Sequence, residues 1–347
     1  MKNYFIATLF ILVLFSGCKQ DFDLTADYKE TPVVYGLLNA QENVHYIRIQ
    51  KGFLIDGNAY NATGIPDSIY YKDLTVKLVP YLNGNPSTPV ITLFPVSVPK
   101  DTGIFASDSN IVYATANNTW LNTDKTYKLE VTNNTNGNTF TTAGLEGIKL
   151  VKDFGINVPA YKGFKMALKT ALPSKIVWYS AANGALYDVK VRFPYREYDA
   201  TTNALLKQDY VEVFMTKSLS YEGDAGSNIT ADFNGTLLLS TLKNALPANP
   251  NIYRTFDVDK GMTFFFAVGG YDLARYISSQ NAQGSGLSSN EALPPYTNIN
   301  GGYGILSSRY YKQLDSVLLT NDAIDTLACH PLTNGLNFRK FNGQLCQ

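Results

Sequence analysis

Short segments of alternating apolar and polar residues, separated by turn residues, are the feature that most limits the fold of this chain. Such alternation occurs, for example, in 74–79 and 127–131. A period of two places one face of a strand against a core and leaves the other face in water. The pairs Asn136-Gly137 and Asn183-Gly184 favour tight turns, because both residue types tolerate positive φ. The sequence therefore predicts a mainly β protein in which each pair closes a hairpin.

The strand pattern changes near residue 150, which divides the chain into two expected domains. Residues 32–150 contain many short strands and predict an immunoglobulin-like β-sandwich. Residues 151–347 predict a larger β-rich domain with a few short helices. Helices are expected at 236–246, where leucines recur every four residues before a proline, and at 271–281.

The first residues resemble a lipoprotein signal peptide. A positively charged start and a short apolar run lead to the sequence Leu14-Phe15-Ser16-Gly17-Cys18. The run is shorter than the approximately 20 residues that a membrane span needs. Small residues before a cysteine are typical of the bacterial lipobox, so residues 1–17 are expected to be removed and Cys18 to carry the lipid. The alternative is an ordinary secretory peptide with an incidental cysteine.

Residues 18–31 are expected to form a lipidated tether. The cysteine is followed by Lys19-Gln20-Asp21-Phe22-Asp23. Acidic residues at this place resemble the surface-export signal of Bacteroidota lipoproteins, which predicts an outer-membrane protein that faces the cell exterior. A plain solvated tether is the alternative.

Charge excludes one class of partner and favours extracytoplasmic location. Lysine plus arginine equals aspartate plus glutamate, 29 of each, so no basic field is present to bind nucleic acid. Charged residues make up only 17% of the chain, whereas tyrosine (24) and phenylalanine (19) are frequent. This composition is typical of an exported β-rich protein with polar loops.

The remaining cysteines, Cys329 and Cys346, lie close together near the C-terminus. In an oxidising compartment they are expected to form a disulfide that closes the C-terminal tail. Two free thiols are the alternative.

Three segments resemble a family of outer-membrane lipoproteins of Bacteroidota that is defined by a domain of unknown function. They are the strand 33–38 (VVYGLL), the segment 101–105 (DTGIF) and the segment 297–305 (TNINGGYGI). Members of this family are often encoded beside TonB-dependent receptors or other outer-membrane barrels. The resemblance therefore implies a barrel partner and no particular reaction. The third segment is rich in glycine but has no lysine of the kind found in a phosphate-binding loop. We therefore interpret it as a tight turn between strands.

Motifs of catalysis and metal binding are missing from the sequence. His45 and His330 lie far apart and form no zinc signature, and no nucleophile elbow occurs. No cofactor, metal or catalytic residue is therefore expected. Ser68, Ser316 and Thr326 each follow an aspartate and precede an apolar residue, a pattern that Bacteroidota use for O-glycosylation, and are candidate modification sites.

The leading hypothesis is a non-catalytic accessory subunit of an integral outer-membrane β-barrel complex. The second hypothesis is a glycan- or nutrient-binding lipoprotein that works with a TonB-dependent transporter, in which aromatic rings stack on the ligand. The candidate contact residues are Tyr60, Tyr70, Tyr71 and Trp120. A secreted glycosidase, which needs only two suitably spaced carboxylates, is the third hypothesis.

Overall fold

The computed structural model describes residues 31–52, 69–99, 109–156, 165–168, 173–284 and 296–346. Strands dominate these residues, and three α-helices accompany them, so the prediction of a mainly β protein is confirmed. The expected signal peptide, Cys18, Tyr60 and Ser68 lie outside the described residues. No helix in the described ranges is long and apolar enough to cross a membrane.

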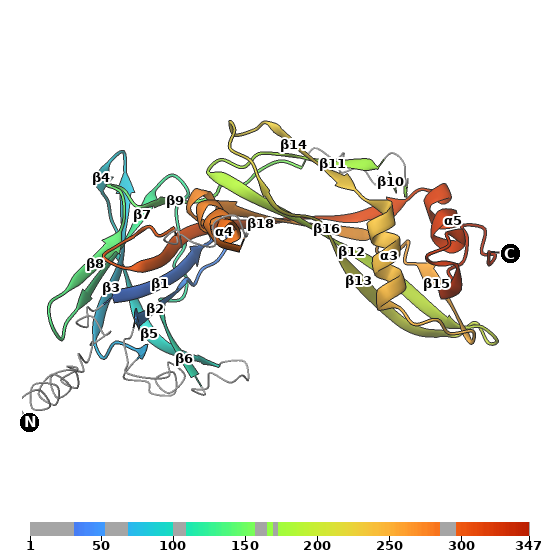
Figure 1. The fold of residues 1–347 in the computed structure, drawn as a ribbon, viewed down its shortest axis with the longest axis horizontal. Helices are drawn as coiled ribbons and strands as arrows, with labels where there is room; N and C mark the ends of the chain where they lie inside the picture. Colours follow the sequence, from blue (N-terminus) through green and yellow to red (C-terminus); the bar gives the residue numbers. More distant parts are fainter. Residues whose placement is uncertain are drawn as a thin grey trace, which may run out of the picture.

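The elements follow the chain in the order shown by the colours of Figure 1. The strands and helices are β1 (Thr31–Leu38), β2 (Tyr46–Gly52), β3 (Leu74–Leu82), β4 (Asn85–Pro86), β5 (Ile91–Pro99), β6 (Ser109–Thr115), β7 (Thr126–Asn133), β8 (Thr139–Thr142), β9 (Ile148–Lys149), β10 (Lys165–Met166), β11 (Ser174–Tyr179), β12 (Gly184–Asp199), β13 (Leu205–Ser220), β14 (Asn228–Phe233), α3 (Gly235–Ala245), β15 (Ile252–Phe256), β16 (Met262–Gly270), α4 (Tyr271–Gly284), β17 (Ile299–Asn300), β18 (Tyr303–Leu319), α5 (Asn321–Cys329) and the 3₁₀ turn η2 (Asn334–Leu336).

The first lobe is one part of a 16-stranded sheet that continues through β18 into the second lobe, and it surrounds its own hydrophobic core. Hydrogen bonds join its strands in the order β18-β1-β2-β6-β5-β3-β7-β8-β17. Alternate residues of these strands, such as Val34 and Leu38 of β1, are fully buried in this core. The Asn136-Gly137 turn connects β7 to the antiparallel β8, which confirms the predicted hairpin. The immunoglobulin-like arrangement stays a prediction, because the strand order follows one continuous path.

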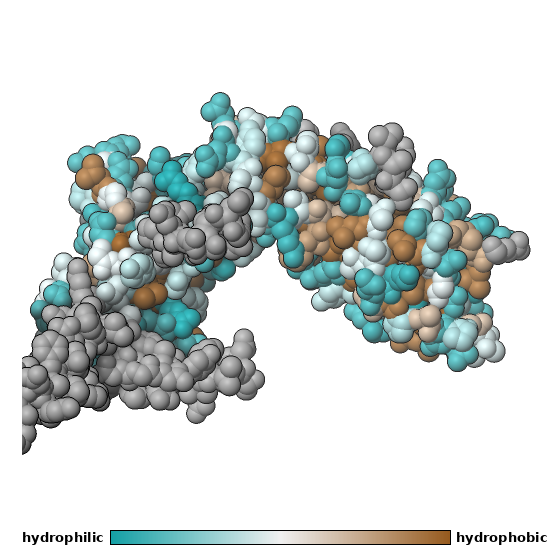
Figure 2. Space-filling view, viewed as in Figure 1, coloured by the Kyte–Doolittle hydropathy of each residue, from teal (hydrophilic) through white to brown (hydrophobic). Residues whose placement is uncertain are grey.

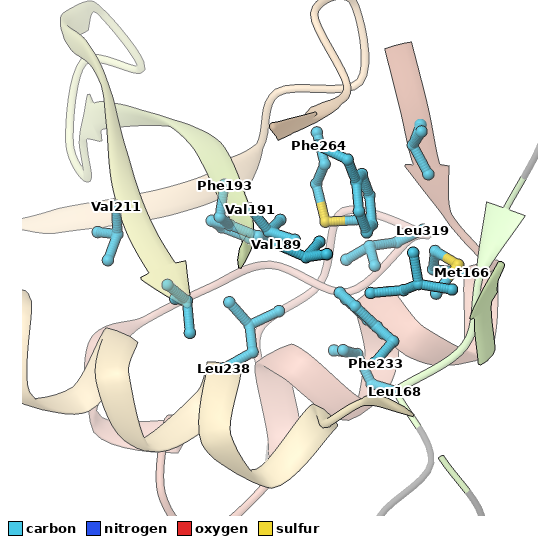
Figure 3. Close-up of a cluster of buried hydrophobic side chains, with 14 of the residues drawn as sticks. Met166, Leu168, Val189, Val191, Phe193, Val211, Phe233, Leu238, Phe264 and Leu319 are labelled. Carbon is cyan, nitrogen blue, oxygen red and sulfur yellow. The ribbon is translucent and has the colours of Figure 1, made fainter. Parts of the chain in front are cut away.

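The second lobe packs helices and a small sheet against one face of a larger sheet. Strands β13, β12, β16 and β18 are neighbours in the sheet, and β15 also pairs with β12. A separate two-stranded sheet, β11 with β14, contributes residues to the same core, as do α3 and α5. Figure 3 shows Leu238 of α3 in this core with Val189 and Val191 of β12. The predicted helix at 236–246 is thus confirmed as α3.

Strand β18 belongs to both lobes. Its first part pairs in parallel with β1, and its second part pairs in antiparallel fashion with β16. Figure 1 shows this long strand passing from one lobe into the other. The two hydrophobic cores divide along the chain between Leu150 and Val151, except that Ile299 and Leu306 return to the first core. The segment around β17 and the start of β18 is therefore shared with the lobe formed by residues 31–150.

The hairpin expected at Asn183-Gly184 is wrong. Strand β11 pairs with β14, whereas β12 pairs with β13, β15 and β16. A turn does occur there, because the N–H of Gly184 donates to the carbonyl of Ala181 at 3.0 Å. The strands separate after the turn because Trp178 of β11 and the inward residues of β12 contribute to one core from two different sheets.

Candidate functional site

The tyrosines proposed as ligand contacts belong to the protein interior. Tyr70 and Tyr71 are each only 7% exposed, and the ring of Tyr71 lies 6.3 Å from that of Phe140. The sequence-based suggestion that these two rings contact a ligand is therefore corrected, because both are buried in the first lobe.

Trp120, by contrast, is 63% exposed. The residue before it is fixed by two hydrogen bonds: Thr119 N–H donates to Asn43 at 2.8 Å, and the Thr119 carbonyl lies 3.1 Å from Nε2 of His45. His45 itself is buried, and burial lowers the pKa of its imidazole. This histidine thus supports the loop that carries Trp120.

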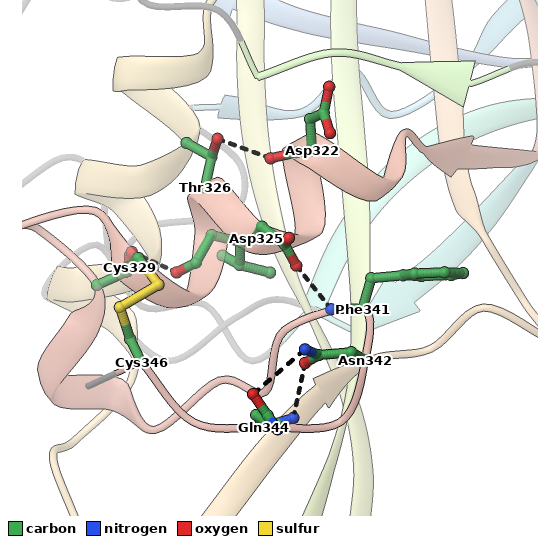
Figure 4. Close-up of a disulfide and its surroundings, with 10 residues drawn as sticks. Asp322, Asp325, Thr326, Cys329, Phe341, Asn342, Gln344 and Cys346 are labelled. Carbon is green, nitrogen blue, oxygen red and sulfur yellow. Dashed lines mark hydrogen bonds between the residues drawn. A yellow bond between two sulfur atoms is a disulfide. The ribbon is translucent and has the colours of Figure 1, made fainter.

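The two described modification candidates lie on different kinds of element. Ser316 is exposed at a bulge where the pairing of β18 with β16 shifts register, and its φ is +61°. Thr326 lies inside α5, where its hydroxyl donates to the carbonyl of Asp322 at 2.7 Å (Figure 4).

Cys329 and Cys346 are bonded to each other, with their Cα atoms 5.2 Å apart (Figure 4). The prediction of this disulfide is confirmed. The neighbouring His330 is occupied in ending α5, since its N–H donates to Thr326 and its Nδ1 accepts from the N–H of Leu332.

A hollow of about 700 Å³ lies at the junction of the two lobes and is the best candidate for a functional site. Most of its lining comes from β12, β13, β16 and β18, and Gln41 contributes from the first lobe. The lining residues are Gln41, Asp153, Asp188, Lys190, Phe214, Phe265, Phe266, Ala267, Tyr310, Tyr311, Lys312 and Gln313. We call it the junction groove. Figure 2 shows the two lobes meeting at an angle, with hydrophobic residues exposed in patches on the second lobe.

Aromatic rings line the junction groove because of the register of its strands. Lys190 of β12 lies opposite Phe214 of β13 on one side and opposite Phe265 of β16 on the other. The ammonium of Lys190 is 5.2 Å from the centre of the Phe265 ring, close enough for a cation–π interaction. On β18, Tyr311 is 45% exposed. Lys217 lies over the ring of Phe214 at 4.2 Å and Arg309 over that of Tyr311 at 5.3 Å, so the groove offers the exposed parts of these rings to whatever enters it.

The charged groups that line the groove already have partners within the chain. Lys190 lies 2.8 Å from a carboxylate oxygen of Glu212, and Lys312 lies 2.8 Å from one of Asp153. Asp188 accepts a hydrogen bond from the N–H of Ser218 at 2.6 Å. These charges therefore act mainly on each other.

Two carboxyl groups at the groove, those of Glu212 and Asp153, have a pKa lowered by their cationic neighbours. Hydrogen bonding by Lys190 lowers the pKa of Glu212, and Arg192 lowers it further. Partial burial alone would raise the pKa of Asp153, but hydrogen bonds from Lys312 and from the N–H of Phe154 bring it below its usual value. A general acid for glycoside cleavage needs the opposite shift, a raised pKa.

Within the described ranges, no group of three or more histidine, cysteine, aspartate or glutamate residues could hold a metal ion.

The sequence carries a readable but weak signal for the groove. Phe214 lies on the same face of β13 as the exposed Tyr210 and Glu212. The buried Val211 and Val213 lie on the opposite face. An aromatic residue on the polar side of an alternating strand is a recognisable exception. Its meeting with β16 and β18 depends on long-range pairing, which alternation alone does not specify.

Comparison with known protein families finds no family model that matches this chain, and comparison with curated proteins finds no match either.

Proposed function

We propose that the protein is a lipid-anchored, surface-exposed accessory subunit of an outer-membrane β-barrel complex, and that the junction groove receives a segment of its protein partner. The lipobox-like sequence that ends at Cys18 and the acidic residues that follow it support the location. The resemblance to barrel-associated lipoproteins supports the kind of partner.

One observation carries the proposal: the junction groove combines exposed rings with charges that are already paired. Phe214 is 41% exposed and Tyr311 is 45% exposed, although both are large aromatic side chains. Exposed aromatic residues gathered beside a hollow are typical of interaction surfaces. Paired and ionised carboxylates supply no obvious general acid, which favours binding over catalysis.

Glycan binding is the second candidate function, and the same rings favour it. The exposed rings of Phe214 and Tyr311 supply surface for stacking on sugar rings, while Asp188 and Gln313 supply hydrogen-bonding groups at the lining.

The test is a mild-detergent purification of the tagged full chain from outer membranes, with mass spectrometry of the proteins that accompany it. The groove variant carries Phe214→Ala and Phe265→Ala. The matched control is Phe94→Ala on β5, because Phe94 is 54% exposed but lies on the first lobe away from the groove.

A barrel protein that accompanies the wild type and the Phe94→Ala control, and is lost from the groove variant, supports the proposal. The proposed function is wrong if the wild type purifies alone even at low salt. Saturable binding of soluble oligosaccharides that the groove variant abolishes, with no barrel protein retained, would favour the glycan function instead.

A further inference from the structure

Strand β13 is an unpaired edge of the large sheet. Its residues form hydrogen-bonded ladders with β12 on one side, and the strand order ends there. In the described part of the chain, no further main-chain hydrogen bond joins residues 205–220 to another element. The strand is 16 residues long, and a long free edge is a template for pairing with another strand.

The position of a proline shows which main-chain groups of β13 face outward. Tyr210 lies opposite Pro194 of β12. Pro194 has no N–H, and its carbonyl accepts from the N–H of Asp257 at 3.2 Å, on the side away from β13. Tyr210 therefore turns its own N–H and carbonyl toward the free edge. The direction in which the main-chain N–H and carbonyl point alternates from one residue to the next along a strand. Gln208 and Glu212, two residues on either side of Tyr210, therefore also turn these groups toward the free edge.

The same edge exposes apolar side chains. Leu205, Leu206, Tyr210 and Phe214 are 51%, 56%, 48% and 41% exposed. Charged residues also occur on the strand, and Lys207 lies 2.6 Å from Asp209 in a single copy of the chain. An occupant of this edge must therefore match both an apolar pattern and a charge pattern.

We propose that β13 pairs in antiparallel fashion with β13 of a second copy of this chain, about a two-fold axis that passes through Gln208. In this register Lys207 of each copy lies opposite Asp209 of the other, so both positive charges meet negative charges. Leu206 of each copy lies opposite Tyr210 of the other, so exposed apolar groups cover one another. Directly opposed cross-strand pairs of these kinds stabilise a sheet.

Other symmetric registers match the strand less well. An axis at Lys207, Asp209 or Glu212 places that charge opposite its own copy, which is unfavourable. An axis at Tyr210 places Lys207 opposite Val213 and Asp209 opposite Val211. Charge complementarity thus selects the register centred on Gln208.

The ends of the ladder confine the pairing. In the register centred on Gln208, Leu205, the first residue of β13, lies opposite Val211, so residues 205–211 of the two copies form the regular stretch; a register shift in the pairing of β13 with β12 next to Leu205 marks its end. Within it, the side chain of Asp209 accepts from the N–H of Tyr210 at 2.8 Å in the single copy. In the pair, the carbonyl of Leu206 from the second copy replaces this acceptor, and Asp209 turns to Lys207 of the other copy. The short regular stretch implies a reversible association.

The experiment is disulfide trapping of the full chain in detergent with single cysteines on β13. Gln208→Cys places two thiols across the axis, where hydrogen-bonded strand partners have Cα atoms about 5.5 Å apart, within disulfide range. Tyr210→Cys is the matched control, because its two copies stand about 14 Å apart in this register. Cys329 and Cys346 are already bonded to one another and do not compete.

A band of twice the chain mass on a non-reducing gel, strong for Gln208→Cys and weak for Tyr210→Cys, is the expected result. Equal or stronger trapping of Tyr210→Cys overturns the proposed register. Absence of a dimer band for Gln208→Cys, or a mixed disulfide with a different protein, overturns pairing with a second copy.

Charge exchange provides an independent measurement by sedimentation equilibrium. Lys207→Glu should weaken self-association at least several-fold, because the new carboxylate then faces Asp209 of the other copy, and Asp209→Lys added to it should restore most of the loss. Lys217→Glu, beyond the regular stretch, should leave association unchanged. If the strength of self-association is the same as in the wild type for all of these variants, the proposal is contradicted. Because these readouts report the chain with itself, they are independent of whether a barrel partner is found.

Discussion

The side-chain amide of Gln41 makes both hydrogen bonds that a neighbouring strand would make to Tyr311. Its Nε2 donates to the Tyr311 carbonyl at 2.8 Å, and its Oε1 accepts from the Tyr311 N–H at 2.9 Å. Gln41 belongs to the first lobe, whereas Tyr311 lies in the part of β18 that pairs with β16 of the second lobe. A neighbouring ion pair between Glu42 and Arg309, at 3.0 Å, crosses the same junction. These contacts hold one wall of the junction groove.

Gln41→Ala should therefore destabilise the protein by about 1 kcal/mol and expose the amide of Tyr311. Hydrogen–deuterium exchange measures this directly, as faster exchange of the peptide that contains Tyr311. Gln41→Glu should give an intermediate result, because its carboxylate still accepts from the N–H but cannot donate to the carbonyl. The control is Gln313→Ala, which should leave Tyr311 protected. Unchanged exchange in Gln41→Ala would show that the amide is protected by other means.

Gly304 is required where β18 passes β1. Its φ is +91°, and a Cβ built on it would lie 2.0 Å from the carbonyl oxygen of Val34. Gly304→Ala should lower the free energy of unfolding by more than about 2 kcal/mol, because a strained backbone and a main-chain clash act together. Gly301→Ala is the matched control: its φ is +77°, but nothing lies within 4 Å of the added carbon.

Urea unfolding of the two glycine variants separates the clash from the backbone strain. Gly301→Ala should lose only about 1 kcal/mol. Similar losses in both variants would mean that the close approach of Gly304 to Val34 contributes nothing.

Local features of the fold can be predicted because their signals are local. Helix α3 has a capping residue, Asn234, whose side chain accepts from the N–H of Leu237 at 2.9 Å, and its leucines recur on one buried face before Pro247. Helix α5, which the sequence analysis does not predict, has a similar but shorter signal: Thr320 caps it, and Ile324 and Leu327 form its buried face.

The turn at Gly301 can be predicted from nearby residues, whereas the strands that pair with β18 cannot. The turn at Gly301 is predictable, since glycines there favour positive φ, and it connects β17 to β18. Nothing near Tyr303 indicates that β18 pairs with β1 and then with β16, because those partners lie far away in the sequence. The same reason explains the wrong hairpin at Asn183 and the missed junction groove. Pairing choices are decided by which faces share a core.

Arg254 is a buried charge that connects several segments, and its loss should be costly. The side chain is 1% exposed and donates to Glu197 at 2.8 Å, to the carbonyl of Leu336 at 2.9 Å and to that of Pro247 at 3.0 Å. Arg254→Met should cost about 3–5 kcal/mol, because it leaves these acceptors and a partly buried carboxylate without a donor. Thermal and urea unfolding measure the loss.

Arg192→Met serves as the control for Arg254. Arg192 also pairs with a carboxylate, Glu212, at 2.8 Å, but its side chain is 38% exposed. An exposed pair contributes about 1 kcal/mol or less, so the control should unfold nearly like the wild type. Equal losses in the two variants would contradict a structural role specific to Arg254.

The ion pair of Asp153 with Lys312 predicts a pH dependence of stability at acid pH. The pKa of Asp153 is below its usual value of 3.8, so the folded state binds its proton more weakly than the unfolded state. Its contribution is complete above the unfolded pKa and is lost as the pH falls through the lower, folded pKa. The contribution is below about 1 kcal/mol, because the Asp153 side chain is 64% exposed and screened by solvent. Urea unfolding should therefore separate the wild type from Asp153→Asn at neutral pH, and the difference should shrink as the pH falls below 3.8 and through the lower, folded pKa. High salt at neutral pH should reduce it as well. A difference that persists unchanged at low pH would assign the effect to packing or hydrogen-bond geometry instead of charge.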